Sequence, residues 1–238
     1  MNRDDPRRTN AQPNTSGLAS DQDPCGSVQA SYDAVAAQYA ARLGDELDHK
    51  ALDRGLLDAF LDLAGSGPIA DLGCGPGHVT RYLTARHPDV TGIDVSPHMI
   101  DIARAAAPEI TFTVGSMLGL PVADEAFSGL VTLYSIIHLS DADRTTACRE
   151  FARTLRPGSW LLVAFHTDAP GFPSGTVNHL TTLFDAAVNL NFRFLNPADV
   201  IGDLETAGFT ITATTIRQPV PAVEYPSRRC YLLAQRRQ

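Results

Sequence analysis

The chain has 238 residues, of which 44% are hydrophobic and 19% charged, so it is long enough to form one domain with a substantial core. Acidic residues exceed basic ones, and the formal net charge of −8 disfavours binding to nucleic acid or to an anionic membrane. No apolar run approaches the roughly 18 residues of a membrane span, and no apolar stretch follows the N-terminal arginines as in a secretory signal. The four cysteines contain no CxxC pair, which indicates reduced thiols rather than disulfides or a zinc site. We therefore expect a cytoplasmic protein, a monomer or homodimer, with no bound metal.

The N-terminal part of the chain contains a polar segment and then two helical patterns. Residues 1–27 have almost nothing to bury and are expected to be a disordered tail. Helices are predicted over 29–43 and 51–64, and the first of them places Tyr32 and Tyr39 on one apolar face. Because residues 28–64 precede the first predicted strand, we expect these N-terminal helices to form a lid over a ligand. A fixed helix on the edge of the sheet is the alternative.

From residue 68 onward, strands and helices alternate. Strands are predicted at 67–73, 89–95, 109–115, 129–137, 159–166, 209–217 and 228–235. Helices are predicted at 78–87, 96–107, 141–155 and 197–208, with Ser96 as a cap before Pro97. Residues 167–195 show no regular pattern and are expected to be an insertion that covers the substrate. The alternation predicts an α/β fold of Rossmann-like type, with a doubly wound, mostly parallel seven-stranded sheet and helices on both faces, over residues 28–238.

The turn after the first strand is rich in glycine and predicts the kind of ligand. Gly73, Gly75 and Gly77 form a GxGxG pattern, whereas a dinucleotide-binding turn places its third glycine at the position that His78 occupies. No Lys or Arg precedes Arg81 to neutralise a pyrophosphate. Asp94 ends the second strand 21 residues after Gly73, where an acid accepts hydrogen bonds from ribose hydroxyls. These features indicate adenosine joined to an amino acid and disfavour an NAD(P)-dependent oxidoreductase.

Four stretches carry a family resemblance, namely DLGCGPG, GIDVSPHMI, VGSMLGLPVADEAFSGLV and LRPGSWLLVAF. In this order they resemble the class I S-adenosylmethionine-dependent methyltransferases, and the likeness covers roughly residues 30–238. The first predicted helix and the residues after it are similar to those of small actinobacterial-type enzymes that act on small molecules.

The resemblance implies a set of contacts with S-adenosylmethionine. Asp71 would orient the methionine amino group, and Asp94 would bind the ribose diol. The other implied cofactor contacts are the backbone of Gly73, Cys74 and Gly75, Val95 and Met99 beside the adenine, Ser116 and Met117 after the third strand, and Tyr134 and Ser135 after the fourth. Ser116 stands where the family usually has an acid or amide, so the polar contact to the adenine departs from the pattern. A cation–π contact between Tyr32 and the sulfonium is a further expectation, with core packing as its alternative.

The acceptor side of the site is predicted from residues near strand ends and in the insertion. His138 follows the fourth strand and His166 ends the fifth, and both are candidates for the base or for a substrate anchor, with a structural histidine as the alternative. Phe172 and Phe192 would form the wall for an apolar acceptor and Arg193 would hold an acidic group on it, unless they belong to the core. We expect methyl transfer to an O, N or C nucleophile of a small molecule, a specialised metabolite, with S-adenosylhomocysteine as product. A catalytically silent, cofactor-binding partner subunit is the alternative.

Overall fold

The computed structural model describes residues 24–238. Its elements in chain order are α1 (Pro24–Leu43), η1 (Glu46–His49), α2 (Ala51–Ala64), β1 (Ile69–Leu72), α3 (His78–Thr84), β2 (Val90–Asp94), α4 (Pro97–Ala106), β3 (Thr111–Val114), β4 (Phe127–Leu133), η2 (Ile136–His138), α5 (Asp141–Thr154), β5 (Leu155–Asp168), β6 (Val177–Leu183), β7 (Ala186–Arg193), α6 (Pro197–Thr206), β8 (Phe209–Arg217) and β9 (Arg228–Arg236). The expected disordered tail lies outside the described residues up to residue 23, and residues 24–27 form the first turn of α1. Within the described part of the chain, no helix is long and apolar enough to cross a membrane.

Seven strands form one sheet in the order β3-β2-β1-β4-β5-β9-β8. The first five strands pair in parallel, and β9 runs antiparallel between β5 and β8. At the centre of the sheet, Ile69 of β1 pairs with Val90 on β2 and with Gly129 on β4. The predicted Rossmann-like, mostly parallel seven-stranded sheet is therefore confirmed.

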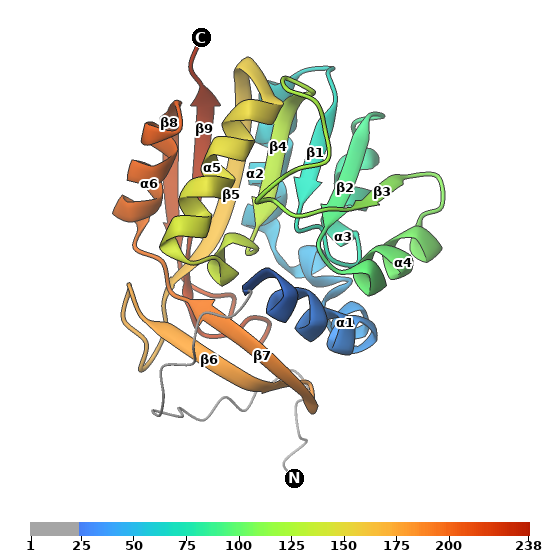
Figure 1. Ribbon diagram of the computed structural model, residues 1–238, viewed down its shortest axis with the longest axis vertical. Coiled ribbons are helices and arrows are strands. Elements are labelled where there is room, and N and C mark those ends of the chain that lie inside the picture. Colours follow the sequence, from blue (N-terminus) through green and yellow to red (C-terminus); the bar gives the residue numbers. More distant parts are fainter. Residues whose placement is uncertain (1–23) are drawn as a thin grey trace.

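Helices cover both faces of the sheet because successive strand residues point to opposite sides. Leu72 belongs to the apolar cluster that contains Phe151 of α5, whereas Ile69 belongs to the cluster that contains Phe60 of α2. Figure 1 shows α5 and α6 in front of the sheet and α2 behind it. Two apolar layers thus fix the sheet and leave its carboxyl edge as the place for a ligand.

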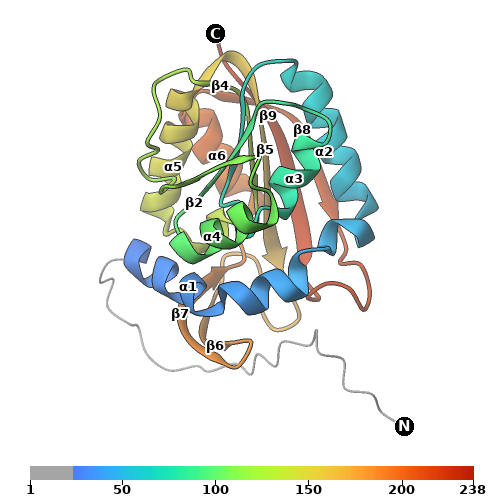
Figure 2. The ribbon, with the colours of Figure 1, turned by 90° about the vertical axis from the view of Figure 1, so that its right-hand side faces the viewer.

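Helix α1 lies across this carboxyl edge, between α4 and the β6–β7 hairpin (Figures 1 and 2). The Asp33 carboxylate accepts a hydrogen bond from the Ser96 hydroxyl at 2.5 Å and one from the His98 backbone N–H at 3.1 Å, which ties α1 to the start of α4. On its other side, the Ser31 hydroxyl oxygen accepts the Asn189 backbone N–H at 2.9 Å. The segment expected to be a lid therefore covers the strand ends.

Two local predictions differ from the structure for backbone reasons. The fourth strand was expected to continue to residue 137, but β4 ends at Leu133 because Tyr134 has a φ of 60° and turns the chain out of the ladder. Residues 167–195 were expected to be irregular, but they contain the β6–β7 hairpin, joined by Phe184 and Asp185 with φ values of 50° and 66°.

Candidate functional site

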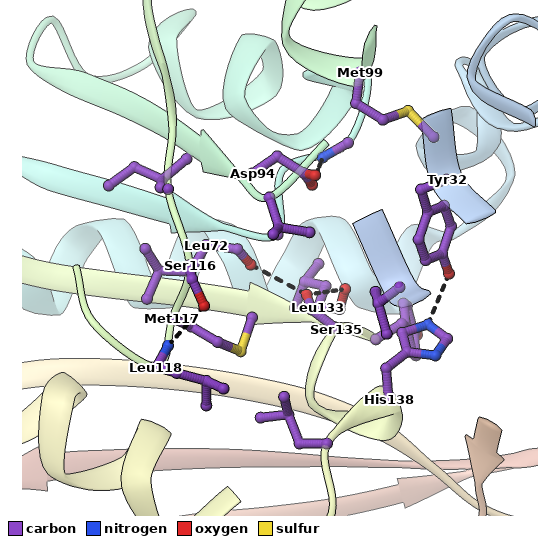
Figure 3. Close-up of a pocket in the computed structure, with 18 of the residues that line it drawn as sticks. Tyr32, Leu72, Asp94, Met99, Ser116, Met117, Leu118, Leu133, Ser135 and His138 are labelled. Atoms are coloured by element: carbon purple, nitrogen blue, oxygen red, sulfur yellow. Dashed lines mark hydrogen bonds between the residues drawn. The ribbon is translucent and has the colours of Figure 1, made fainter. Parts of the chain in front are cut away.

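A cavity opens at the carboxyl ends of β1, β2 and β4, beneath α1 (Figure 3). Most of the residues expected to hold the cofactor line it. The lining consists of Val28, Tyr32, Tyr39, Leu72, Gly73, Gly75, Ile93, Asp94, Val95, Met99, Gly115, Ser116, Met117, Leu118, Leu120, Leu133, Tyr134, Ser135, His138, Leu139 and Asp143. The strand–turn–helix order brings together positions that are far apart in the sequence.

The glycine turn presents bare backbone to the cavity. Gly73 and Gly75 have φ values of 70° and 52°, a region that residues with a Cβ rarely adopt. A Cβ added to Gly73 would lie 2.5 Å from the Ser135 Cβ at the end of β4. The turn is fixed by the Gly75 N–H, which donates to the Asp94 carboxylate at 2.8 Å. At Gly73 the space that a Cβ would need is taken by Ser135, while the backbone of Gly73 and Gly75 forms part of the cavity lining.

Asp94 is positioned to accept hydrogen bonds from a ligand. Its Oδ1 accepts the Ser96 N–H and its Oδ2 accepts the Gly75 N–H, both at 2.8 Å. A carboxylate has about four lone-pair sites, so each oxygen retains capacity for a ligand hydroxyl. Burial raises the pKa of Asp94 and the nearby Asp33 carboxylate raises it further, while the backbone N–H donors oppose the shift. Hydroxyl donors from a bound ribose would add to the stabilisation of the charged form.

Two residues of the expected set lie behind the turn and do not line the cavity with their side chains. The Asp71 carboxylate is buried and accepts the Thr80 hydroxyl at 2.7 Å, and burial raises its pKa to about 6. The Cys74 side chain belongs to a separate apolar cluster with Ile100 and Phe112 under α4. The thiol of Cys74 points into the core, so only its backbone belongs to the turn.

The residues expected beside the adenine also line the cavity. Val95 and Met99 come from the end of β2 and the first turn of α4, and Ser116 and Met117 follow β3. The Ser116 hydroxyl oxygen accepts the Leu118 N–H at 3.2 Å, which holds this loop against the cavity. The wall is mostly apolar with a small number of polar atoms, as flat heterocyclic ligands require.

Tyr134 is held in a backbone conformation that is uncommon for a bulky residue, with its φ of 60°. Its hydroxyl lies 2.5 Å from the Tyr231 hydroxyl and donates to the buried Asp53 carboxylate at 3.1 Å. The Lys50 ammonium lies 5.2 Å from the ring centroid and the Arg229 guanidinium 5.8 Å from it. These contacts fix the start of the turn that carries Ser135 and His138.

His138 lines the cavity and contacts helix α1. Its Nε2 lies 2.7 Å from the Tyr32 hydroxyl oxygen, and its Nδ1 lies 3.1 Å from the carbonyl oxygen of Asn191 on β7. Burial lowers the pKa of His138 to about 4 and the positive charge of Arg193 lowers it further, while the hydrogen bond to Asn191 opposes the shift. The imidazole is therefore neutral near pH 7.

His166 does not line the cavity. It is buried behind Tyr134, with ring centroids 5.1 Å apart and the planes stacked at 27°. Its Nδ1 forms a 2.6 Å hydrogen bond with the Ser227 hydroxyl. Burial, and the positive charges of Arg229 and Lys50, hold the pKa of His166 well below its usual range. Of the two candidate histidines, His138 alone meets the cavity.

The three residues expected on the acceptor side take different positions. The Phe192 ring stands edge-on to His138, with centroids 4.9 Å apart, and therefore backs the cavity wall. Phe172 stacks instead on Phe194 at 5.2 Å. Arg193 is half-buried, and its Nε has no hydrogen-bond partner. None of the three is part of the cavity lining itself.

Some lining residues were not predicted from the sequence. Val28, Leu118 and Leu139 are apolar residues without any motif, so no signal could have separated them from the core. Asp143 has a signal of another kind, because it follows the N-cap residue Ser140 of α5, whose hydroxyl accepts the Asp143 N–H at 3.1 Å and donates to the Asp143 carboxylate at 2.7 Å. Within residues 24–238, no group of three His, Cys, Asp or Glu residues could hold a metal ion.

Comparisons with known proteins agree with this geometry. Residues 69–158 match a family model described as a methyltransferase domain. The chain is 28% identical over 209 residues to the N-demethylindolmycin N-methyltransferase of Streptomyces griseus, with 79% of this chain and 88% of that protein covered. It is 32% identical over 165 residues to an O-methyltransferase of Pyrenophora dematioidea, with 64% of this chain and 58% of that protein covered, so it spans less than two thirds of that relative.

A structural comparison shows the same fold in a solved protein. The structure of an S-adenosylmethionine-dependent methyltransferase from Methanosarcina mazei aligns with a TM-score of 0.67 at 17% identity, covering 76% of this chain and 97% of that one. The matched family model runs from β1 to the start of β5. Helix α1 and the β6–β7 hairpin lie outside it, so the family model does not describe the elements that cover the cavity.

Proposed function

The chain belongs to the class I S-adenosylmethionine-dependent methyltransferases, and we propose that it methylates an oxygen, nitrogen or carbon nucleophile of a small molecule. The enzyme uses S-adenosylmethionine and releases S-adenosylhomocysteine. The observation that carries the proposal is the cavity in which the backbone of the glycine turn meets the Asp94 carboxylate, at the carboxyl edge of the sheet.

The residues of the cavity fit the cofactor. Asp94 keeps lone pairs for the two ribose hydroxyls, and the backbone of Gly73 and Gly75 leaves room for the ribose and methionine portions. Val95, Met99, Ser116 and Met117 would enclose the adenine. Asp71 would act from behind the turn, where the Thr80 hydroxyl stabilises its charge and its carboxylate biases the site toward the positive methionine amino group.

The protein's tasks in methyl transfer are alignment, exclusion of water and removal of a proton. When bound, S-adenosylmethionine supplies a methyl group on a sulfonium, so the leaving group needs no further activation. The cavity walls hold the acceptor in line with the methyl group. His138, neutral and buried at the cavity wall, takes a proton that the acceptor loses. His166 instead buttresses Tyr134 through their ring stack.

Apolar side chains suggest the nature of the acceptor. Val28, Leu118 and Leu139 line the cavity, and Phe192 backs His138, which favours a small apolar or aromatic molecule. The names of the relatives, an N-methyltransferase and an O-methyltransferase, support specialised metabolism but do not select the acceptor atom. Three free, buried cysteines favour a reducing compartment such as the cytoplasm. In this proposal α1 opens to admit ligands and closes to exclude water.

The proposal is tested by measuring S-adenosylhomocysteine release with panels of phenols, amines, carboxylic acids and activated carbon acids. We expect release with at least one class by the wild-type protein, and strongly reduced release by Asp94→Ala, which controls for contaminating activity. If the wild type binds S-adenosylhomocysteine yet turns over only after a second protein is added, the chain is a cofactor-binding partner subunit instead.

A further inference from the structure

The hydrogen bonds of His138 determine which of its nitrogens carries the proton. A carbonyl oxygen can only accept, so the Nδ1 that lies 3.1 Å from the Asn191 carbonyl bears the hydrogen. In the neutral ring, Nε2 is then an acceptor, and the Tyr32 hydroxyl at 2.7 Å must donate to it. Figure 3 shows this bond on the side of the cavity opposite Ser116. The lone pair that would take a proton is thus already occupied by a hydroxyl.

The surroundings of the pair keep this arrangement fixed. The Phe192 ring abuts His138 on one side, and the Tyr32 ring stands edge-on to His138 with centroids 5.3 Å apart. Tyr39 packs edge-on against Tyr32 at 5.9 Å. Burial raises the pKa of Tyr32, and the negative charge of Asp94 raises it further, so the hydroxyl keeps its proton in the resting protein. Because the Tyr32 hydroxyl occupies the Nε2 lone pair, an acceptor can bind Nε2 directly only by displacing that hydroxyl.

We propose that the Tyr32 hydroxyl is a catalytic proton relay between the methyl acceptor and His138. This inference rests on the proposed function and adds a residue to it. As the acceptor's nucleophilic atom forms its bond to the methyl carbon and the carbon–sulfur bond breaks, the acceptor proton moves to the Tyr32 oxygen. The hydroxyl proton of Tyr32 moves at the same time to His138 Nε2. The products are the methylated acceptor, the neutral thioether, an intact Tyr32 hydroxyl and a His138 imidazolium, which later loses its proton to water.

Charge balance favours this route in a buried site. Before transfer, the one positive charge that the reaction moves is on the sulfonium, and the neutral imidazole does not repel it. After transfer, the sulfonium is gone and the positive charge is on His138, whose Nδ1–H still donates to the Asn191 carbonyl. The reaction therefore leaves the number of positive charges unchanged, and burial and the nearby Arg193, which both disfavour the imidazolium, promote its later loss of the proton to water.

The relay also connects the lid to the chemistry. Tyr32 belongs to α1 and His138 to η2, so the pair exists only when α1 covers the cavity. The neighbouring Asp33 accepts the Ser96 hydroxyl, and the Ser96 N–H donates to Asp94. A short chain of hydrogen bonds thus runs from the residue expected to bind the ribose to the helix that carries the relay. When α1 packs over the cavity, the hydrogen bond from Ser96 to Asp33 and the hydrogen bond between Tyr32 and His138 form together.

The first test needs no acceptor and uses Tyr32→Phe, which removes the hydroxyl and keeps the ring. Nitrogen-15 NMR of the histidine rings, in protein saturated with S-adenosylhomocysteine, should show His138 as the Nδ1–H tautomer with a hydrogen-bonded Nε2. In Tyr32→Phe the Nε2 resonance should move to the position of a free acceptor, with Nδ1 unchanged. An identical Nε2 resonance in the two proteins would overturn the relay, because the bond would be absent when the cofactor site is filled.

The second test measures turnover with the acceptor that supports S-adenosylhomocysteine release by the wild type. Tyr32→Phe should lower kcat by about 10²–10⁴-fold while the dissociation constant for S-adenosylhomocysteine changes less than about threefold, because the ring stays. The loss should shrink for acceptors that are already ionised. Tyr82→Phe removes a hydroxyl on α3 that donates to Asp58 outside the cavity, and it should retain the wild-type solvent deuterium isotope effect, which Tyr32→Phe should reduce.

The outcomes separate the relay from the function on which it rests. If Tyr32→Phe keeps kcat within about threefold of wild type while a His138→Gln variant loses activity, His138 acts directly and the relay is wrong. If the wild type binds S-adenosylhomocysteine but releases none with any acceptor class, the proposed function fails, and the NMR comparison still decides whether the relay pair forms.

Discussion

Substitution of alanine for Gly73 perturbs the glycine turn at its tightest point. The φ of 70° at this residue lies in the left-handed region, which costs a residue with a Cβ about 1–2 kcal/mol. The new Cβ would also lie 2.5 Å from the Ser135 Cβ, and forced overpacking of this kind costs about 1–3 kcal/mol. Together these terms predict that Gly73→Ala lowers the free energy of unfolding by about 2–5 kcal/mol.

Urea unfolding of a double-mutant cycle separates the two terms. Ser135→Gly removes the side chain that the new Cβ would meet, so the double variant should recover about 1–3 kcal/mol relative to the sum of the single changes. The backbone term should remain in the double variant. A Gly73→Ala protein with a free energy of unfolding within about 0.5 kcal/mol of wild type would contradict this prediction, as would strictly additive effects, because the turn would then not pass so close to Ser135.

Three further predictions concern charge, strain and the lid. Because the pKa of Asp71 is raised to about 6, the folded protein keeps a proton that the unfolded chain loses above about pH 4, so stability falls as pH rises from about 4 to 6. Asp71→Asn should abolish this fall in stability between pH 4 and 6, and it should stabilise the protein at pH 7 by up to about 3 kcal/mol. Urea unfolding midpoints at pH 4 and 7 measure both effects. A variant whose stability depends on pH as in the wild type would contradict the prediction. Asp185→Gly should stabilise by about 1 kcal/mol, because the aspartate has a φ of 66° at the hairpin tip, and a lower melting temperature would count against it. Amide exchange in residues 30–50 should slow when S-adenosylhomocysteine is added, and unchanged exchange would mean that α1 is a fixed part of the core.

The parallel sheet was predictable because its strands carry a local signal. Each is a short apolar run bounded by turn or cap residues, and the cap at Ser96 is seen in the structure, where its hydroxyl oxygen accepts the Met99 N–H at 3.1 Å. The β6–β7 hairpin had no such signal. Two-residue hairpin loops favour Asn-Gly or Asp-Gly, whereas this loop is Phe184-Asp185, held in the left-handed region although neither residue is glycine. The Phe184 ring contacts α1, where the Arg42 guanidinium lies 4.6 Å from its centroid.

The cofactor side of the site was more predictable than the acceptor side. The glycine turn and Asp94 are close in sequence, and the spacing between them is set by one strand–helix–strand unit. The acceptor side depends on contacts between distant segments. Tyr32 and His138 are separated by 106 positions, and the sequence favoured an aromatic role for Tyr32 over its hydrogen bond. The direction of the Cys74 side chain could not be predicted from the neighbouring sequence either, because it depends on packing against Ile100 and Phe112 under α4.

Calorimetric titration of the purified protein with S-adenosylhomocysteine and, separately, with NAD tests whether this cavity binds S-adenosylmethionine. We predict that S-adenosylhomocysteine binds at one site per chain and that NAD does not bind. We also predict that Asp94→Ala weakens S-adenosylhomocysteine binding by about 1–3 kcal/mol, since the ribose hydroxyls lose their acceptor. Binding of NAD alone, or an S-adenosylhomocysteine dissociation constant that Asp94→Ala leaves unchanged, would contradict the assignment of this cavity.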